Sequence, residues 1–481
     1  MGEQNVRLAE RLVAIGWSRD DMAVVLDEFR TDIEIFREAN VPLFAELEEH
    51  SAAYQKITGG LEAEWEGERV TIPQLQPHLK VRDRAVRERA FRLGAEAYLA
   101  QREALAALFD TMFALRQRLA ANAGFANYME YAFRAKHRFD YSPADCARFH
   151  AAVEATAAPA VERLMAHRRE SLGVATVRPW DTLVQLESER PVRPLPRHGR
   201  FRGAGQAHLR CARPGAGGSS ARWQRPGCST SRADRARPPA AIAPKLPWRG
   251  RPFIFMNAVG VPDDVNTLVH EAGHSFHDFA AHRQPFIWQR GTGHEAAELA
   301  SMSMELLVTP HLTQPTGYHA GRGAGGGDRA ARGRAEQPGA HRQRRRLPAL
   351  DLHQRRGARC GGARCRLVAA AGALRARRGL VGARARAGVA LVSPAAHLRV
   401  PVLLHRVRHC AARRLAVVAR RAARPGGDDA ALQAGARPGG TRGLPEIYAA
   451  AGARLIFDEA GMRELVDLWR PPAGVARGHA S

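Results

Sequence analysis

Apolar residues recur every three or four positions over most of residues 1–189, which is the periodicity of amphipathic helices. Between Asp83 and Asn122 they fall on one helical face: Leu105, Leu108, Met112, Leu115 and Leu119. Gly124 follows as a stop signal, and Ser142 and Pro143 begin a further helix as N-cap and first helical residue. The core face of that helix would carry Phe149, Val153, Val161 and Leu164. The pattern predicts a helical scaffold without a catalytic group.

The pattern changes after residue 251. An apolar run followed by the turn signal Val259-Gly260 predicts a short strand, formed by Phe253, Ile254, Phe255, Met256 and Asn257. Asp263 and Asp264 then mark the start of a helix, where the helix dipole favours acidic side chains. A glycine-rich loop at 291–293 leads to a second helix from about Glu295 to Val308, and residues 445–469 predict one or two amphipathic helices.

The first of these helices contains a pattern typical of metal sites, His270-Glu271-Ala272-Gly273-His274. Residues four apart lie one turn above each other on a helix, so His270 and His274 can direct both imidazoles at one ion. Two histidines and a carboxylate, with one position left for water, form the ligand set of a hydrolytic zinc site. We therefore predict one zinc ion here, with Glu271 as the general base that activates the attacking water.

A third ligand must come from the second helix. Glu298 follows His270 after enough chain for a loop and a returning helix, and Glu295 is a competing candidate nearer the loop. Glu305 lies on the same helical face as Glu298 and is expected to hold a ligand histidine through its second ring nitrogen. His277 is expected either to line the substrate cleft or to pack in the interior.

Three further residues near the motif have simpler interpretations. Gly273 lies inside a helix, where glycine costs about 1 kcal/mol relative to alanine, which suggests that another element packs closely there. His282 and His294 are expected at the surface.

The net charge of +25 at first suggests nucleic acid as a partner. The charge is concentrated in residues 190–243, which carry +11, and residues 318–444, which carry +23. From His319 to Ile447 there is no Phe, Tyr or Trp, although aromatic side chains normally supply much of a core. An Arg-rich nucleic-acid-binding protein is therefore a rival interpretation, weakened because no aromatic residues are interleaved for base stacking.

Arginine outnumbers lysine 69 to 4, which indicates GC-rich coding DNA. Such DNA read out of frame yields Ala, Gly, Arg and Pro, so we interpret residues 196–243 and 318–443 as frameshifted segments; a genuine disordered Arg-rich tail is the alternative. The predicted organisation is a helical region, a suspect segment, a catalytic core, a second suspect segment and a C-terminal helical segment: 1–195, 196–243, 244–317, 318–443 and 444–481.

Cysteine usage and hydropathy bear on the cellular compartment. Five of the six cysteines fall in the suspect segments, so no disulfide framework is predicted. The first residues contain no apolar signal core, and no apolar run reaches membrane-spanning length. We therefore expect a cytoplasmic protein that does not depend on a membrane.

The string FIFMNAVGVPDDVNTLVHEAGHSFH, followed by AELASMSMELL, resembles the catalytic core of the oligoendopeptidase F family of zinc metallopeptidases, relatives of thimet oligopeptidase. The stretches RERAFRLGAEAYLA and LRQRLAANAGFANYMEYAF are similar to the helical region of the same family. The resemblance covers roughly residues 60–195 and 246–317, and more weakly 444–470.

The resemblance implies a mainly α, two-lobed body with a deep cleft that admits short unstructured peptides, with no specific nucleic acid as partner. It implies His270, His274 and Glu298 as zinc ligands and Glu271 as base. The strand at 253–257 would be an edge to which the substrate adds as an extra strand. Family members also carry tyrosines in a glycine-rich C-terminal segment, and no Tyr occurs between His319 and Ile447. An inactive pseudoenzyme is therefore a further alternative.

Overall fold

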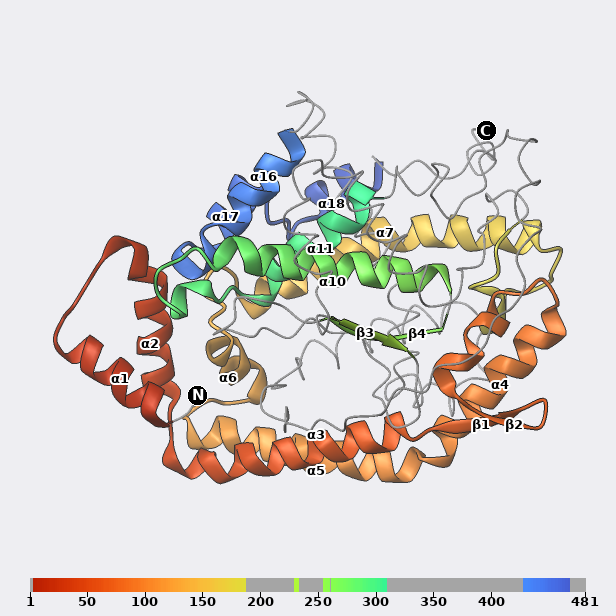
Figure 1. Cartoon of the computed structure of the whole chain (residues 1–481), viewed down its shortest axis with the longest axis horizontal. Helices are drawn as coiled ribbons and strands as arrows, with labels where there is room; N and C mark the ends of the chain where they lie inside the picture. The colour runs from red at the N-terminus through yellow and green to blue at the C-terminus, as the bar shows by residue number, and fades with distance from the viewer. Residues whose placement is uncertain (1–2, 187–228, 233–253, 260, 309–426, 468–481) are drawn as a thin grey trace, which may run out of the picture.

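The computed structural model describes residues 3–186, 229–232, 254–259, 261–308 and 427–467. This part of the chain is mostly helical, which confirms the predicted mainly α class (Figure 1). None of its helices combines the length and the apolar character needed to cross a bilayer. The α-helices are α1 (Glu3–Ala14), α2 (Ala23–Ile35), α3 (Val41–Gly59), α4 (Arg84–Ala100), α5 (Arg102–Asn122), α6 (Tyr128–Ala135), α7 (Pro143–Ser171), α10 (Pro262–Ala281), α11 (His294–Val308), α16 (Gly427–Ala436), α17 (Leu444–Ala450) and α18 (Glu459–Asp467).

The first helices form one end and one long edge of the molecule. α1 and α2 pack against each other around buried Met22, Val25 and Phe29, and they lie together at the left in Figure 1. α3 and α5 pack side by side along the lower edge of the same view. The buried side chain of Asn40, just before α3, donates to the carbonyl of Leu119 in α5 at 3.1 Å. This contact ties the two long helices together.

The helical stretch predicted between Asp83 and Asn122 is divided into α4 and α5 at Gln101. Asp83 caps α4, since its Oδ1 accepts the backbone N–H groups of Ala85 at 2.8 Å and Val86 at 3.3 Å. Of the predicted core positions in α5, three are buried and two are half-buried: Leu105, Leu115 and Leu119, then Leu108 and Met112. Gly124, with φ of +85°, ends the helix in a conformation that glycine adopts readily.

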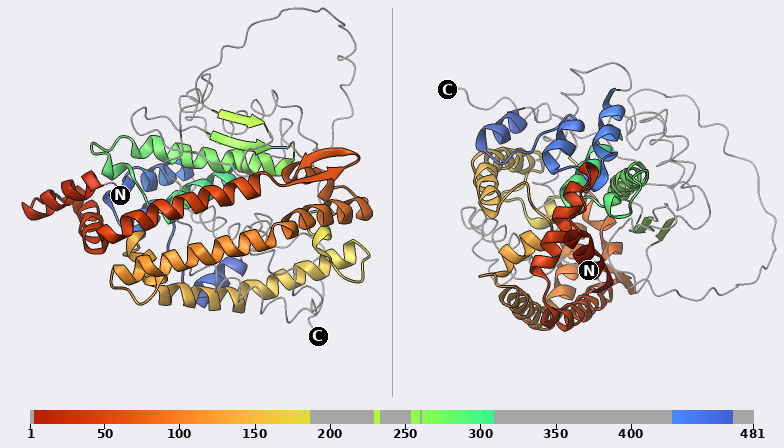
Figure 2. Two further views of the ribbon diagram at one scale, coloured as in Figure 1. Left: turned by 90° about the horizontal axis from the view of Figure 1, so that it is seen from below. Right: turned by 90° about the vertical axis from the view of Figure 1, so that its left-hand side faces the viewer.

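α7 begins as the sequence predicts. The Ser142 hydroxyl accepts the N–H of Asp145 at 3.3 Å, and the Asp145 carboxylate accepts the N–H of Ser142 at 2.7 Å, which completes a capping box. Leu164 is buried, whereas Val161 is half-buried. Phe149 and Val153 pack on a cluster that includes buried Met462 and Leu465 of α18. α18, the last described helix, therefore packs against the N-terminal helix α7, as the two views of Figure 2 also show.

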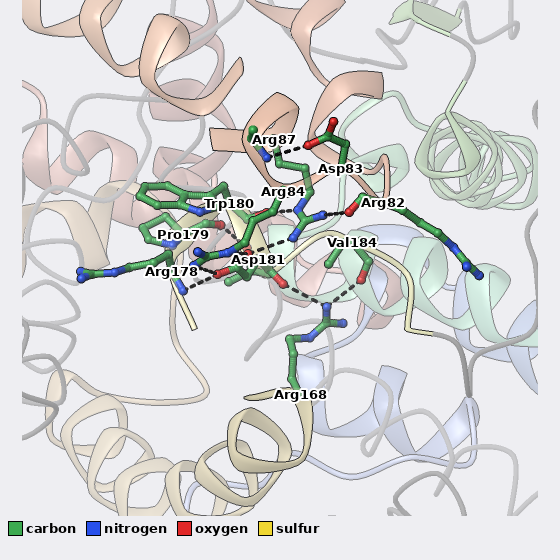
Figure 3. Close-up of polar contacts among 12 residues, drawn as sticks. Arg82, Asp83, Arg84, Arg87, Arg168, Arg178, Pro179, Trp180, Asp181 and Val184 are labelled. Atoms are coloured by element: carbon green, nitrogen blue, oxygen red, sulfur yellow. Dashed lines mark hydrogen bonds and ion pairs between the residues drawn. The ribbon is translucent and has the colours of Figure 1, made fainter. Parts of the chain in front are cut away.

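A buried ionic network fixes the segment after α7 (Figure 3). Asp181 is fully buried, and its Oδ1 and Oδ2 accept from Arg84 Nε at 3.0 Å and Nη2 at 2.9 Å. Arg87 donates to Oδ1 at 3.0 Å, and Arg168 of α7 donates to the carbonyl of Asp181 at 3.1 Å. Burial raises the pKa of Asp181, but the hydrogen bonds from Arg84, from the Arg178 N–H and from Arg87 outweigh it and lower the pKa. The network joins α4 to α7.

Two small sheets accompany the helices. β1 (Glu62–Trp65) and β2 (Glu68–Thr71) form an antiparallel hairpin, whose turn residues Glu66 and Gly67 both have positive φ. β3 (Ser229–Arg232) pairs in parallel with β4 (Ile254–Ala258), which contacts α10. β4 corresponds to the predicted strand shifted by one residue; Phe253 lies outside the described residues.

Part of the second Arg-rich segment, residues 318–444, packs against α10 and α11. α16 contacts α10 and α11, and the side chain of Gln284 donates to the carbonyl of Arg437 at 2.7 Å. Gly440 follows in the 3₁₀ helix Gly439–Thr441, where a Cβ would lie 2.5 Å from the carbonyl oxygen of Gly291. The remainder of this segment, and all of 196–243 except β3, lies outside the described residues. The predicted frameshifts and domain boundaries stay predictions.

Candidate metal centre

The start of α10 is fixed by the two acids that mark it in the sequence. Asp264 accepts the backbone N–H groups of Val259 and Val261, both at 2.9 Å, and so holds the chain between β4 and α10. Asp263 forms an ion pair of 2.7 Å with Lys80, from the segment before α4. The helix that carries the histidines is thereby tied to the N-terminal region and to the strand below it.

α10 and α11 approach closely at Gly273, as the position of a glycine inside the helix suggested. A Cβ on Gly273 would lie 2.9 Å from the carbonyl oxygen of Ala300 and still closer to the Cα of Ser301. Only a residue without a side chain allows this separation of the two helix axes. The close approach brings the side chains of α11 within reach of those on α10.

The side chains of His270, His274 and Glu298 converge at this crossing. Among the described residues they form a group in which one potential ligand atom from each lies within 4.8 Å of the others. Glu298 Oε2 is 3.3 Å from Nε2 of His270, and its Oε1 is 3.9 Å from Nε2 of His274. The two imidazole rings are nearly perpendicular, with centroids 4.8 Å apart.

These separations suit a zinc ion. Tetrahedral coordination with bonds of about 2 Å places neighbouring ligand atoms about 3.3 Å apart. The distance from Oε2 of Glu298 to His270 has this value, and the distance from its other oxygen, Oε1, to His274 exceeds it by about half an ångström. Two imidazole nitrogens and a carboxylate oxygen are also the donor atoms that zinc prefers in hydrolytic sites. The residues therefore fit the metal that the sequence predicts.

Glu305, two turns after Glu298, contacts the other nitrogen of the first histidine. Its Oε1 lies 2.7 Å from Nδ1 of His270, which leaves Nε2 directed at Glu298. Burial lowers the pKa of His270, but the hydrogen bonds to Glu298 and Glu305 outweigh it and raise the pKa to about 10. For Glu298 burial raises the pKa, and the contact with His270 lowers it to about 2. The site thus stabilises positive charge, and a bound metal would replace the proton on His270.

Glu271 follows the first histidine and is buried, with a relative exposure of 7%. Its backbone carbonyl accepts the hydroxyl of Ser275 at 2.9 Å, within the regular turn of α10. A buried carboxylate is costly unless it is paired, hydrogen-bonded or protonated, and buried carboxylates are frequent at functional sites.

Glu295, the competing candidate for third ligand, lies outside the group formed by the two histidines and Glu298. Its Oε1 accepts from Arg138 Nε at 3.1 Å and from the Tyr141 hydroxyl. Burial raises the pKa of Glu295, but the hydrogen bond from Tyr141 and the charge of Arg138 lower it. The geometry favours Glu298 over Glu295 as the third ligand.

The remaining histidines have other surroundings. His277 is buried, and its Nε2 lies 3.1 Å from the Thr292 hydroxyl. It also lines a cavity of about 100 Å³ between α10, α11 and α16, to which none of the proposed metal ligands contributes, so a role in a substrate cleft stays a prediction. His282 and His294 are exposed.

Three residues that contact the start of α11 were not identified from the sequence. Arg138 and Tyr141 bind the Glu295 side chain, and the Tyr448 hydroxyl donates to the Glu295 carbonyl at 3.2 Å. Burial, and then the charges of Glu295 and Glu298, raise the pKa of Tyr448 to about 12, so that it remains a donor at neutral pH. No periodicity or spacing links these positions, which lie more than 150 residues from Glu295.

Comparisons with known proteins agree with this geometry. The sequence profile of peptidase family M3 matches residues 78–194 and 241–321, and the second match includes both helices of the metal centre. No curated protein sequence matches the chain.

Solved structures share the fold. A protein described as oligoendopeptidase F from Bacillus anthracis strain Ames superimposes with a TM-score of 0.69 at 16% identity, over 95% of this chain and 78% of the other. PZ peptidase A, solved with an inhibitor, superimposes with a TM-score of 0.71 at 16% identity, over 92% of this chain and 78% of the other. The profile match and the shared fold agree with the resemblance seen in the sequence: this chain carries the peptidase family M3 profile over residues 78–194 and 241–321, on the fold of oligoendopeptidase F structures.

Proposed function

We propose that the protein is a zinc-dependent endopeptidase that hydrolyses short, unstructured oligopeptides. The observation that carries the proposal is the convergence of His270, His274 and Glu298 within 4.8 Å, at the crossing of two helices. The match to a family of peptidases supports peptides as the substrate class. We keep the expectation of a cytoplasmic enzyme as part of the proposal.

In this proposal His270, His274 and Glu298 hold one zinc ion. When bound, the ion lowers the pKa of a water molecule to about 7 and polarises the scissile carbonyl. Glu305 holds the His270 ring in the tautomer whose Nε2 can donate its lone pair, because its carboxylate accepts from Nδ1. Ser301 donates to Oε2 of Glu298 at 3.1 Å and restricts the orientation of that carboxylate.

Glu271 is the proposed general base. It takes a proton from the attacking water and delivers that proton to the nitrogen of the leaving amine, so that the carboxylate is regenerated after each turnover. Its position next to His270 on α10 fixes it relative to the metal ligands. Its burial keeps bulk water away from the carboxylate and strengthens its interaction with the reacting groups.

We further propose that β4 aligns the substrate. Among the described residues it pairs with β3, and the peptide would add at its other edge by backbone hydrogen bonds. Such hydrogen bonds are independent of side chains, which suits an enzyme that accepts varied short peptides. The side chains of β4 alternate between buried and half-buried positions, from Ile254 to Ala258. The half-buried set, Phe255 and Asn257, is available to contact the peptide.

The proposal is tested by zinc content and by hydrolysis of a quenched fluorescent peptide. We expect His270→Ala to lose stoichiometric zinc, because one of three ligands is removed. Glu271→Gln should retain zinc and lose turnover by about 100-fold or more, the usual contribution of a general base. His294→Ala, at an exposed histidine, is the matched control and should resemble the wild type.

Two outcomes would contradict the proposal in different ways. A wild-type protein that binds no zinc with both histidines intact would overturn the metal site. A protein that binds zinc but hydrolyses no peptide would indicate an inactive pseudoenzyme with a preserved metal centre.

A further inference from the structure

Glu295 lies in the first turn of α11, three residues before the proposed ligand Glu298. Arg138 contacts its Oε1 through Nε at 3.1 Å and Nη2 at 3.0 Å, and the Tyr141 hydroxyl donates to the same oxygen. All three side chains are withdrawn from solvent; those of Arg138 and Glu295 are 14% and 23% exposed. Charge-assisted hydrogen bonds of this kind are stronger than neutral ones and define geometry well.

The same loop between α6 and α7 also binds α17, in the C-terminal segment. Asp140 Oδ2 accepts the backbone N–H of Leu444 at 2.9 Å, at the start of α17. Tyr448 of α17 in turn donates to the carbonyl of Glu295 at 3.2 Å. Apolar contacts lie beneath these hydrogen bonds, formed by Ala296, Leu444, Ile447, Tyr141 and Tyr448. The loop, α11 and α17 therefore meet at Glu295.

The loop between α6 and α7 is also bound to α2, through His137. His137 has a φ of +52°, which is unusual for a residue with a side chain. Its Nε2 lies 2.9 Å from Asp32 of α2, and this contact holds the strained turn in place. Arg138 follows directly, so its guanidinium is anchored to the body of the N-terminal region. It also lies over the rings of Phe133 and Tyr141.

The position of α11 along its own axis decides where Glu298 stands relative to the two histidines. At the crossing itself, Gly273 meets the backbone of Ala300 and Ser301 without a side chain that would interlock the helices. Sliding of α11 by a fraction of an ångström would change the separations of 3.3 Å and 3.9 Å to His270 and His274. The contact of Glu305 with His270 opposes this motion beyond the crossing, and an attachment at the start of α11 would oppose it from the other end.

We propose that Arg138 and Tyr141 are positioning residues for the metal centre: by clamping Glu295 they set the place of Glu298. This inference rests on the proposed function, since it assigns a role toward the zinc ion. Glu295, the alternative candidate for the third ligand, lies one turn before Glu298. In this proposal it is the residue through which the N-terminal region binds α11.

The test measures Zn²⁺ affinity by competition with a chelator, alongside urea unfolding of the same proteins. Arg138→Gln should weaken zinc binding by about tenfold, the lower end of the usual effect for residues behind metal ligands. Tyr141→Phe removes one hydroxyl and should weaken zinc binding by about fivefold. Arg30→Gln, which breaks an exposed ion pair with Asp27, is the matched control and should leave zinc affinity unchanged.

A double variant separates positioning from stability. Arg138→Gln leaves the half-buried carboxylate of Glu295 without the charge of Arg138, which should lower the urea midpoint. Arg138→Met combined with Glu295→Met removes both charges, so the urea midpoint should return toward that of the wild type. Zinc affinity should remain about tenfold weak, because the directional contact is still missing. Added zinc should restore the turnover of the Arg138→Gln variant and of the double variant, since Glu271 and the ligands are intact in both.

Recovery of zinc affinity together with stability in the double variant would overturn the clamp, because its effect would then be structural only. Equal zinc affinity in the wild type and in all clamp variants would overturn the clamp and leave the proposed function intact. A wild type that binds no zinc would overturn both the proposed function and the clamp.

Discussion

Asp181 and Glu298 are both acidic residues held among basic side chains by the packing of long helices, yet their surroundings differ. Asp181 is fully buried, and guanidinium nitrogens of Arg84 and Arg87 occupy both of its oxygens at 2.9 to 3.0 Å. The side chain of Glu298 is 40% exposed and faces the imidazoles of His270 and His274 at 3.3 Å and 3.9 Å.

The difference separates a structural cluster from a reactive one. A guanidinium remains charged at any pH at which the protein is folded, and its planar fork leaves no room for a further ion. An imidazole can release its proton and offer a lone pair to a metal. A carboxylate closed off by arginines therefore connects helices, whereas one that faces histidines across a short gap can share a cation with them.

The largest effect is expected from Asp181→Asn. It leaves the buried guanidinium of Arg87 without its counter-charge, which should lower the free energy of unfolding by about 3 to 5 kcal/mol. Zinc affinity of the folded fraction should not change. Urea unfolding measures the first quantity and chelator competition the second. Asp27→Asn, in an exposed pair with Arg30, serves as control. A loss of zinc affinity matching the loss of stability would remove the distinction between the two clusters.

A smaller and opposite pattern is expected from Glu305→Gln. The amide keeps the shape of the side chain and can still accept from Nδ1 of His270, but it loses the charge that makes the ring a better ligand. Zinc affinity should fall by about tenfold, while the urea midpoint stays near that of the wild type. If Glu305→Gln unfolds more easily and binds zinc normally, Glu305 contributes to stability, as Asp181 does, and does not support the metal site.

The smallest effect concerns a third cluster, at the contact of α2 with the end of α6. Burial, partly offset by His137, raises the pKa of Glu28 to about 7 from 4.5. Burial lowers the pKa of His137, but Asp32 and Glu28 outweigh it and raise the pKa above 6.5. Both groups hold protons more tightly in the folded protein, so stability should fall as pH rises: for Glu28 between about 4.5 and about 7, and for His137 above 6.5.

Glu28→Gln should flatten this dependence, because a neutral amide has no proton to lose. The measurement is the thermal midpoint of both proteins from pH 5 to pH 8, with Glu38→Gln at an exposed position as control. Parallel curves for wild type and Glu28→Gln would show that Glu28 does not titrate in this pH range.

Local patterns accounted for much of the fold and for the core of the candidate site. The cap at Ser142, the stop at Gly124 and the start of α10 at its acids are decided by neighbours within a few residues. The spacing of His270 and His274 is likewise set by one turn of a helix. Close packing at Gly273 could be inferred because glycine inside a helix needs a reason, although its partners on α11 could not.

Contacts between distant segments could not be found in this way. The carboxylates of Asp181 and Glu295 meet arginines 97 and 157 residues away, and any of the many arginines in the sequence would have been an equal candidate. The division of the predicted stretch at Gln101 also has no local signal, since no Gly or Pro occurs there. Such features depend on how the helices pack and require the three-dimensional structure.

The hydrogen bond between Asp140 and Leu444 joins positions 304 residues apart in the sequence. During synthesis on the ribosome, the loop that contacts α11 can therefore form this hydrogen bond only after residue 444 has emerged. Contacts between distant segments also form slowly, because long loops must close first. The metal centre is thus expected to become ordered only after the segment that contains Leu444 has been synthesised, and the proposed peptidase activity would be delayed until then.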